Sequence, residues 1–400
     1  MSFVPIIPNK IEPVKNSERI GKIVVAGASA HLFDKVCYGL NRPRPDIEVS
    51  ELRLPAGLTP GNGVSPAVRN ALGDTGTGMA VLIFENGLGP EKTGRLAEDV
   101  KLAGGKKAFT ILMREEKASA QYDGPEPPVP APQFIDQVFS FRGSEALFIA
   151  MVGLLEDRLN FQNDLESVVL VVDDKPKHYS RFLTEFYEIN RQRTRVRLAC
   201  DYEEAQRVIL DCAQGENLAG VISDLWFPRN GRHDQSAFAL LEFLRKSGQI
   251  PITLRKVPAI VMSADKQALD ALHEQVPDVF CFDKNDPLLL QHVRQTVNDF
   301  FGFGAFRIFV PGSGEPFIVE DLHELKVMLK AMPDSVLLHY SRHNYFSGWL
   351  RLHGHKELAA AIRPIDSEDA GEVRALLLEK FGQYEMGLLA SGKVRLAWDS

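Results

Sequence analysis

The sequence predicts an α/β protein with two doubly wound, five-stranded parallel sheets, followed by a small mixed α+β domain that is mostly helical. Three observations support this prediction. Apolar, strand-like runs alternate with helical patterns from Lys22 to about Asn160, and a second series of the same kind runs from Val168 to Phe300. After it, Phe301-Gly-Phe-Gly304 interrupts the last helix, and the pattern changes to one hairpin and several helices.

The composition is that of an ordinary globular protein, long enough for about two to four domains. Of the 400 residues, 44% are hydrophobic and 25% are charged, and 46 basic and 53 acidic side chains give a net charge of −7. We therefore expect neither nucleic acid nor a membrane surface as the main partner. The start of the chain lacks a secretory signal pattern, and Cys37, Cys200, Cys212 and Cys281 form no Cys-x-x-Cys pair. Both observations favour the reducing cytoplasm, with buried thiols.

The first series contains five predicted strands but no motif for catalysis or nucleotide binding. Gly27-Ala28-Ser29 follows the first strand, yet Gly-x-Gly-x-x-Gly and the P-loop pattern are absent, so turn chemistry is favoured. Asp123–Pro132 is too rich in proline to be helical, and we interpret it as an excursion rather than a domain linker. A binding or scaffolding role is the more economical interpretation. The predicted strands are Lys22–Ala26, Glu48–Leu54, Ala80–Phe84, Ala108–Met113 and Gln137–Phe141, and the predicted helices are Ala30–Leu40, Lys92–Leu102 and Ser144–Leu159.

The second series opens with Ser167–Asp174, an apolar run that ends in two adjacent carboxylates. A run of β-branched residues and leucine is typical of a strand buried on both faces of a parallel sheet. Asp173 and Asp174 repel each other, so keeping both ionised requires a cation or several hydrogen-bond donors, and Mg²⁺ prefers such oxygens. The alternative is that the pair merely ends the strand, with Pro176 opening the next helix.

Three further polar residues follow later strands of this series. Asp224 ends the third predicted strand, Ser263 ends the fourth, and Lys284 comes after the fifth. The carboxyl ends of parallel strands lie at one edge of a sheet, so we expect these residues to converge on the acidic pair. Such a set can hold magnesium and a phosphoryl group. The other predicted elements are a helix containing Tyr179 and Phe186, the strand Val196–Cys200, and helices at Glu203–Cys212, Ser236–Lys246 and Pro287–Phe300.

Residues 167–300 resemble the receiver domain of bacterial two-component response regulators. The matching motifs are the acidic pair, Asp-x-x-x-Pro at Asp224–Pro228, Pro-x-x-x-x-Ser-Ala at Pro258–Ala264, and the lysine after the fifth strand. The resemblance implies a flavodoxin-like sheet of the receiver type that is phosphorylated on an aspartate with Mg²⁺ present. It implies Asp224 as the phosphoacceptor, Ser263 as the switch hydroxyl, Lys284 as the invariant lysine, and Asp173, Asp174, Asp224 and the main-chain carbonyl of Trp226 as magnesium ligands.

Two positions depart from the family pattern. Asn285 follows the lysine where members usually have proline, and Cys281 occupies the position of the aromatic switch residue. We expect the phosphorylation chemistry of the site to survive both changes. The usual signal, a rotamer change of an aromatic side chain, is not expected. The first series has a similar β/α order without an acidic pair, so it resembles a pseudo-receiver. The predicted domains are an N-terminal extension (1–20), a pseudo-receiver-like domain (21–163), a receiver domain (167–300) and an output or interaction domain (301–400).

The sequence of the predicted output domain (301–400) indicates a hairpin followed by helices. A Pro-Gly-Ser-Gly turn separates Phe306–Val310 from Phe317–Val319. Four histidines in a nearby aromatic stretch suggest a zinc site or a phosphohistidine. No cysteine or nearby carboxylate completes a ligand set, so an interface whose histidines bond the backbone is favoured. The histidines are His339, His343, His353 and His355, and the predicted helices are Asp321–Ala331, one segment near Ser335–Leu352, Lys356–Ile362 and Glu368–Phe381.

The stretch His339–His355, together with Ile362-Arg363-Pro364, resembles a segment ahead of the ATP-grasp domain in bacterial proteins related to pyruvate phosphate dikinase and phosphoenolpyruvate synthase. This resemblance implies that the chain regulates such a phosphotransferase or was once fused to one. A regulatory subunit or module of that enzyme is therefore one alternative function, and a scaffold whose receiver is never phosphorylated is another.

The favoured interpretation is a cytoplasmic two-component response regulator that signals through protein contacts. It is not expected to be an enzyme beyond the chemistry of its own phosphorylation and dephosphorylation. The expected partners are a histidine kinase or phosphotransfer protein and a protein output target, and a homodimer is left open. Neither DNA nor membrane binding is expected, because no helix-turn-helix stands out and the charge is acidic.

Overall fold

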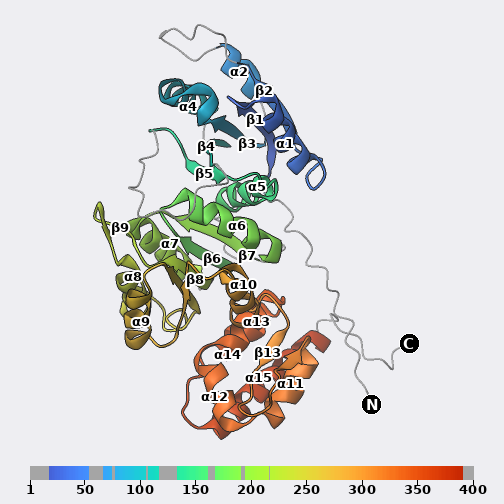
Figure 1. Ribbon diagram of the computed structural model, residues 1–400. Coiled ribbons are helices and arrows are strands. Elements are labelled where there is room, and N and C mark those ends of the chain that lie inside the picture. The colour runs from blue at the N-terminus through green and yellow to red at the C-terminus, as the bar shows by residue number, and fades with distance from the viewer. Residues whose placement is uncertain are drawn as a thin grey trace. The chain divides into compact units, whose positions relative to one another are not determined.

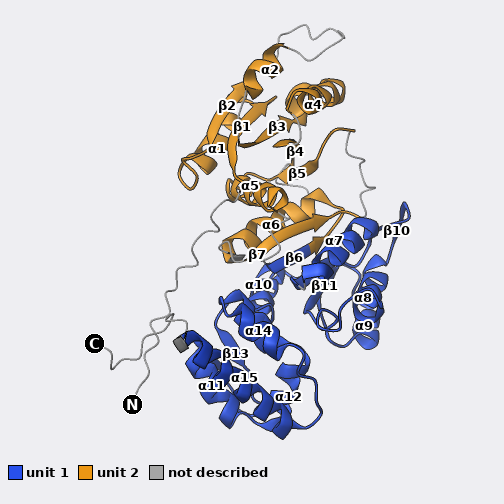
Figure 2. Ribbon diagram, turned by 180° about the vertical axis from the view of Figure 1, so that it is seen from behind, with its two compact units in different colours: residues 1–15, 165–170, 202–400 blue, residues 16–164, 171–201 orange. Residues whose placement is uncertain are grey.

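The computed structural model describes most of the chain and divides it into two compact units (Figure 1, Figure 2). Of the described residues, unit 1 contains those in 165–170 and 202–400, and unit 2 contains those in 16–164 and 171–201. The division falls inside the strand Ser167–Val172. The proline-rich segment Asp123–Pro132 and nearly all of the predicted N-terminal extension lie outside the described residues. Those are 18–53, 66–73, 77–104, 107–116, 133–160, 167–190, 194–215 and 217–390.

Five parallel strands form the first sheet, in the order β2-β1-β3-β4-β5. Every residue of β3 is buried, as a central strand covered on both faces requires. All five predicted strands and all three predicted helices are present. The strands are β1 (Ile20–Ala26), β2 (Glu48–Leu52), β3 (Gly78–Phe84), β4 (Ala108–Glu115) and β5 (Gln137–Phe141), and the helices are α1 (Ala30–Asn41), α2 (Pro66–Leu72), α3 (Glu85–Leu88), α4 (Pro90–Gly104) and α5 (Ala146–Leu159).

Helices α2 and α4 cover one face of this sheet. Val68 and Leu72 of α2 and Leu96 of α4 share an apolar cluster with Val24 and Val81 of the sheet. Helices α1 and α5 contact each other, and α5 also contacts β1. Helices α2 and α3 were not predicted, because helices of 7 and 4 residues are too short to show a helical period of apolar positions.

The second sheet has the order β12-β11-β8-β6-β7. Numbered along the chain within each sheet, both sheets have the strand order 2-1-3-4-5, which is typical of flavodoxin-like α/β folds. All six residues of β6 are buried, which confirms the predicted burial on both faces. The strands are β6 (Ser167–Val172), β7 (Thr194–Ala199), β8 (Leu218–Asp224), β11 (Ala259–Ser263) and β12 (Val279–Asp283), and the helices are α6 (Pro176–Asn190), α7 (Tyr202–Gly215), α8 (Ser236–Lys246), α9 (Lys266–Gln275) and α10 (Leu289–Phe300).

An antiparallel hairpin that was not predicted follows β8. Its strands are β9 (Phe227–Arg229) and β10 (Arg232–Asp234). Asn230 and Gly231 connect them with φ angles of 51° and 72°, the left-handed conformation that a two-residue type I′ turn needs. The Asn-Gly pair is the sequence signal for this turn. Strands of three residues each are too short to add an alternating apolar pattern.

Helix α6 packs against the first sheet, inside unit 2. The Tyr179 hydroxyl donates to the carbonyl oxygen of Val138, and the N–H of Ser140 donates to Ser180 Oγ at 3.0 Å. The Phe139 and Tyr179 rings meet edge to face with centroids 6.0 Å apart. Both bonds go to backbone groups of β5, which lies at the edge of its sheet and has no further strand to pair with. Helix α6 therefore belongs structurally to both βα series.

Residues 301–390 form a mostly helical domain around one apolar core. Trp349 is 1% exposed, and its ring lies 5.8 Å from that of Phe306. The segment predicted near Ser335–Leu352 is two helices rather than one, because Asn344 adopts a left-handed φ of 57° and ends the helical path. The elements are β13 (Phe306–Ile308), β14 (Phe317–Val319), α11 (Leu322–Ala331), α12 (Asp334–Arg342), α13 (Tyr345–Leu352), α14 (Lys356–Ile362) and α15 (Ala370–Ala390).

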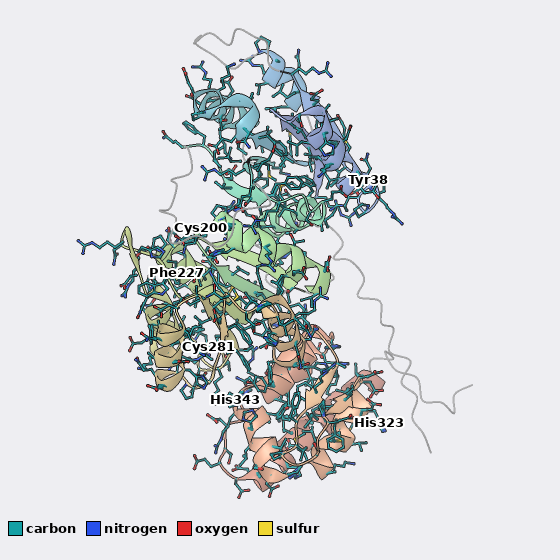
Figure 3. All side chains as sticks on the ribbon, in the orientation of Figure 1. Tyr38, Cys200, Phe227, Cys281, His323 and His343 are labelled. Atoms are coloured by element: carbon teal, nitrogen blue, oxygen red, sulfur yellow. The ribbon has the colours of Figure 1, made fainter. Side chains whose placement is uncertain are left out.

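Two features bear on the predicted compartment. All four cysteines are free thiols, but only Cys212 is buried, so the prediction of four buried thiols is wrong for Cys37, Cys200 and Cys281, which are half-buried. Figure 3 labels Cys200 and Cys281. Burial, together with the charge of Asp270, raises the pKa of Cys281 to about 11, so this thiol stays protonated at neutral pH. Within the described ranges, no helix is both long enough and apolar enough to span a membrane.

Candidate phosphoacceptor and metal site

Asp224 ends β8 and forms a buried ion pair with Lys284, the residue after β12. Lys284 Nζ lies 2.8 Å from Asp224 Oδ2, and the two side chains are 5% and 4% exposed. The other oxygen, Oδ1, accepts hydrogen bonds from the N–H groups of Leu225 at 2.7 Å and Trp226 at 3.4 Å. Donors therefore hold both oxygens of the carboxylate, and the predicted acceptor and lysine are in direct contact.

Ser263 ends β11, the strand between β8 and β12. Met262 pairs in register with Asp224, so Ser263 lies one residue beyond the acceptor position. Its Oγ accepts a hydrogen bond from the Asp265 N–H at 3.1 Å, and its carbonyl oxygen accepts one from the Lys284 N–H at 2.7 Å. The side chain is 3% exposed. The sheet register thus brings the predicted acceptor, hydroxyl and lysine to one edge of three neighbouring strands.

The acidic pair follows β6. Asp173 is 3% exposed, its N–H donates to the carbonyl oxygen of Ala199 at 3.1 Å, and its Oδ1 accepts from the Lys175 N–H at 2.9 Å. Asp174 is half-buried. Helix α6 begins at Pro176, so the pair also ends a strand and precedes a helix, as the alternative interpretation expects. The two interpretations are compatible, because a strand end at the sheet edge is where a ligand site forms.

His178 lies beside Asp173 inside unit 2, a contact that was not predicted. His178 Nδ1 is 3.7 Å from Asp173 Oδ2. The metal-binding roles of Asp173, Asp174, Asp224 and the Trp226 carbonyl remain predictions. The available signal was the position of His178 as third residue of α6, from which side chains reach back toward the residues before a helix.

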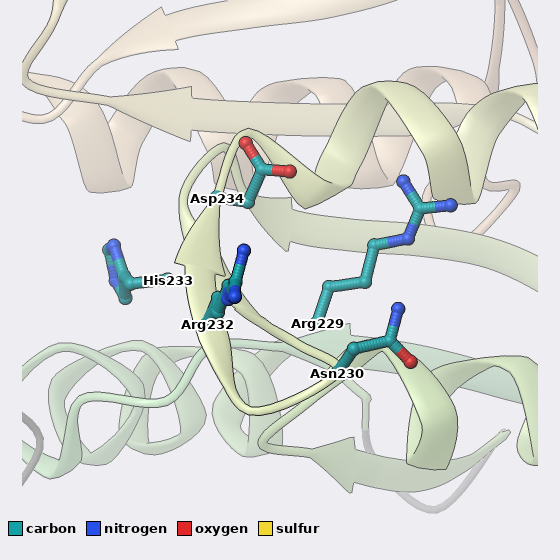
Figure 4. A pocket seen from close by; sticks show the side chains of 5 residues that line it. All are labelled: Arg229, Asn230, Arg232, His233 and Asp234. Atoms are coloured by element: carbon teal, nitrogen blue, oxygen red, sulfur yellow. The ribbon is translucent and has the colours of Figure 1, made fainter.

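The β9–β10 hairpin adds a cationic surface next to the acceptor strand. The indole of Trp226 is half-buried and lies parallel to the His233 ring, with planes 3° apart and centroids 6.4 Å apart. The Arg229 guanidinium lies over the Tyr202 ring, 4.8 Å from its centroid. An open cavity of about 480 Å³ is lined by Arg229, Asn230, Arg232, His233 and Asp234 (Figure 4).

Histidines of the C-terminal domain (residues 301–390) bond to the backbone. His343 Nδ1 lies 2.7 Å from the carbonyl oxygen of His339, and His353 Nδ1 lies 2.9 Å from that of Trp349. The His353 ring also stacks on the indole, with centroids 4.3 Å apart. Within the described part of the chain, no group of three metal-binding side chains includes any of these histidines. The favoured interpretation expected these backbone contacts, whereas the interface that it also expected stays a prediction.

Lowering the pH is expected to destabilise the C-terminal domain through His355. The ring is 8% exposed, its Nδ1 lies 3.2 Å from the Tyr384 hydroxyl oxygen, and burial lowers its pKa. The unfolded chain takes up this proton near pH 6.5, at about the ordinary histidine pKa. The folded state therefore has its full advantage above that pH and loses it as the pH falls below it.

Urea unfolding of the wild type and His355→Gln, measured from about pH 8 to pH 5, checks this expectation. The wild type should lose more stability on acidification than His355→Gln. The matched control is His323→Gln, an exposed position on α11, which should keep the wild-type dependence (Figure 3). An unchanged pH dependence in His355→Gln would contradict the assignment.

No protein-family profile matches this chain. No curated protein matches it either. One solved structure with detectable similarity is an ABC transporter solute-binding protein from Burkholderia graminis in complex with D-arabinose. It shares 12% identity, covering 65% of this chain and 82% of that chain, at a TM-score of 0.21. A TM-score this low supports no argument about fold or function.

Proposed function

We propose that the chain is a response regulator of the two-component type, with a receiver-type second sheet phosphorylated on Asp224. The observation that carries the proposal is the buried pair of Asp224 and Lys284. The Asp224 carboxylate lies at the end of a central strand, where the Lys284 ammonium and backbone N–H groups hold it. Ser263 supplies a hydroxyl on the neighbouring strand, and Asp173 supplies a second buried carboxylate.

The chain's own residues suit the transfer of a phosphoryl group to a carboxylate. An oxygen of Asp224 attacks phosphorus, a new O–P bond forms, and the bond to the donor breaks with its electron pair remaining on the donor. The Lys284 ammonium and the Ser263 hydroxyl then hold oxygens of the transferred group. The Leu225 N–H fixes the orientation of the carboxylate before the reaction.

The donor set also suits a divalent cation. Asp173 and Asp224 are both buried carboxylates at the ends of strands, and hard cations prefer such oxygens. When bound, Mg²⁺ would neutralise charge on the incoming phosphoryl group. The residues proposed to hold it are Asp173, Asp174, Asp224 and the carbonyl of Trp226.

A histidine kinase or phosphotransfer protein would supply the phosphoryl group, and the output domain would pass the signal to a protein target. Contacts inside unit 1 support this route. A Cβ added to Gly220 of β8 would clash with the Phe301 ring, so the acceptor strand packs tightly on the chain that enters the output domain. The Phe300 and Tyr345 rings lie 5.1 Å apart. A change in β8 therefore reaches the output domain through direct packing.

Phosphorylation by acetyl phosphate in Mg²⁺ buffer, read as the intact mass of the full chain, tests the proposal. We expect one added phosphoryl group on the wild type and none on Asp224→Asn. The matched control is Asp234→Asn, an exposed carboxylate in the hairpin, which should label like the wild type. Labelling that persists in Asp224→Asn would sink the proposal.

A further inference from the structure

The β9–β10 hairpin of unit 1 places two arginines directly opposite each other. Arg229 and Arg232 pair in register across the two strands, and both line the cavity shown in Figure 4. Like charges that face each other across an antiparallel pair destabilise it, and a two-stranded hairpin is marginal to begin with. Within the described residues, neither arginine forms an ion pair with a carboxylate. An anion supplied by another molecule would relieve this repulsion.

Acidic side chains around the hairpin have other partners. Asp234 lines the same cavity, and its Oδ1 accepts a hydrogen bond from the next backbone N–H at 2.8 Å. On the neighbouring helices, Glu203 Oε1 accepts one from the Asn230 N–H at 3.0 Å, and Glu242 pairs with Lys246 at 3.2 Å. The lining of the cavity therefore keeps a net positive charge. Its two guanidinium groups are available for bidentate bonds to carboxylates.

Aromatic rings and a buried hydroxyl hold the hairpin in place. The Arg229 guanidinium lies 4.8 Å from the centroid of the Tyr202 ring, which restricts its orientation. On the other strand, the His233 ring lies parallel to the indole of Trp226. At the base of the hairpin, the buried Ser236 hydroxyl donates to a carbonyl oxygen of β9 at 2.7 Å. Side chains fixed in this way lose little freedom on binding, which favours affinity.

The composition of this surface suits a protein partner better than a small molecule. Small-molecule pockets are mostly apolar and bury most of their ligand, whereas this cavity is open and lined by polar side chains. Tryptophan, tyrosine and arginine, the residue types enriched in the energetic centres of protein interfaces, meet here in Trp226, Tyr202 and Arg229.

Charge indicates the chemistry of the partner. The whole chain carries a net charge of −7, so a cationic hairpin offers an acidic partner a distinct place to bind. We propose that the β9–β10 hairpin is the docking site for an acidic segment of a protein partner, whose carboxylates bind Arg229 and Arg232. This inference goes beyond the proposed function and does not depend on phosphorylation of Asp224.

Fluorescence anisotropy of a labelled hexaglutamate peptide, titrated with the full chain in about 50 mM salt, tests the inference. The double variant Arg229→Gln/Arg232→Gln should weaken binding by at least about tenfold. Arg232→Lys keeps the charge but not the planar fork, so it should recover only part of the affinity that Arg232→Gln loses. The matched control is Arg207→Gln, an exposed arginine of α7, which should bind like the wild type. Circular dichroism checks that each variant is folded.

Absence of peptide binding to the wild type overturns the inference, as does equal affinity in the wild type and the double variant. A loss for Arg207→Gln as large as that for Arg232→Gln also overturns it, because binding then follows overall charge rather than the hairpin. A second titration uses pyrophosphate as the probe. If pyrophosphate binds through the two arginines and the peptide does not, the site takes a small phosphate compound and the docking of a protein partner is wrong.

Discussion

Replacing Lys284 by methionine is expected to destabilise the second sheet by about 3–5 kcal/mol in metal-free buffer at neutral pH. Lys284 Nζ lies 2.8 Å from the Asp224 carboxylate, and the two side chains are only 5% and 4% exposed. The variant leaves a buried charge without its ammonium, while methionine keeps the apolar length of the side chain. Hydrogen exchange of the β8 and β12 amides measures the local free energy of unfolding.

Two further variants separate charge from packing. Asp224→Asn/Lys284→Met removes both charges and should recover most of the loss, because no uncompensated ion remains. Lys246→Met breaks an exposed pair with Glu242, at 3.2 Å and with side chains 75% and 67% exposed, so it should cost less than about 0.5 kcal/mol. A cost for Lys284→Met no larger than for Lys246→Met would remove the main support for the proposed acceptor site.

The sheets could be predicted because strands buried on both faces can be recognised from the sequence alone. β3 and β6 are buried at every residue, so their sequences are mainly apolar. Such a run identifies a strand even when the strands that pair with it are unknown. Topology then predicts which strand ends meet. The contact between Asp224 and Lys284, about 60 positions apart, follows from that rule, since each is at the carboxyl end of a strand in one sheet.

Features set by single residues were harder to predict. His178 sits on a helix that was interpreted through its apolar face, and only the three-dimensional path of α6 places it beside Asp173. The break between α12 and α13 depends on one left-handed residue, Asn344, inside a pattern that otherwise favours one helix. The hairpin depends on Asn230 and Gly231, whose signal is strong but spans two positions. Local backbone conformation, rather than periodicity, decides all three.

Replacing Trp349 by alanine is expected to cost about 3–5 kcal/mol of the stability of the output domain. The indole is 1% exposed, its Nε1 donates to the carbonyl oxygen of Gly304 at 3.0 Å, and its ring contacts Phe306 and His353. Truncation leaves a cavity in the core and a carbonyl without this donor. Hydrogen exchange of helices α11 to α15 should show the loss.

The matched control is Trp349→Phe, which keeps an aromatic ring but removes the Nε1 donor. It should cost about 1–3 kcal/mol, which is less than the alanine variant. The backbone of Trp349 lies against Gly302, where φ is 88° and an added Cβ would lie 2.8 Å from the tryptophan Cα. Gly302 follows the Phe301 that packs on β8, so loosening α13 by loss of the indole disturbs this contact as well. The alanine variant should therefore raise exchange in β8 as well. If β8 keeps its wild-type exchange while α11 to α15 open, packing through Phe301 does not couple the acceptor strand to the output domain.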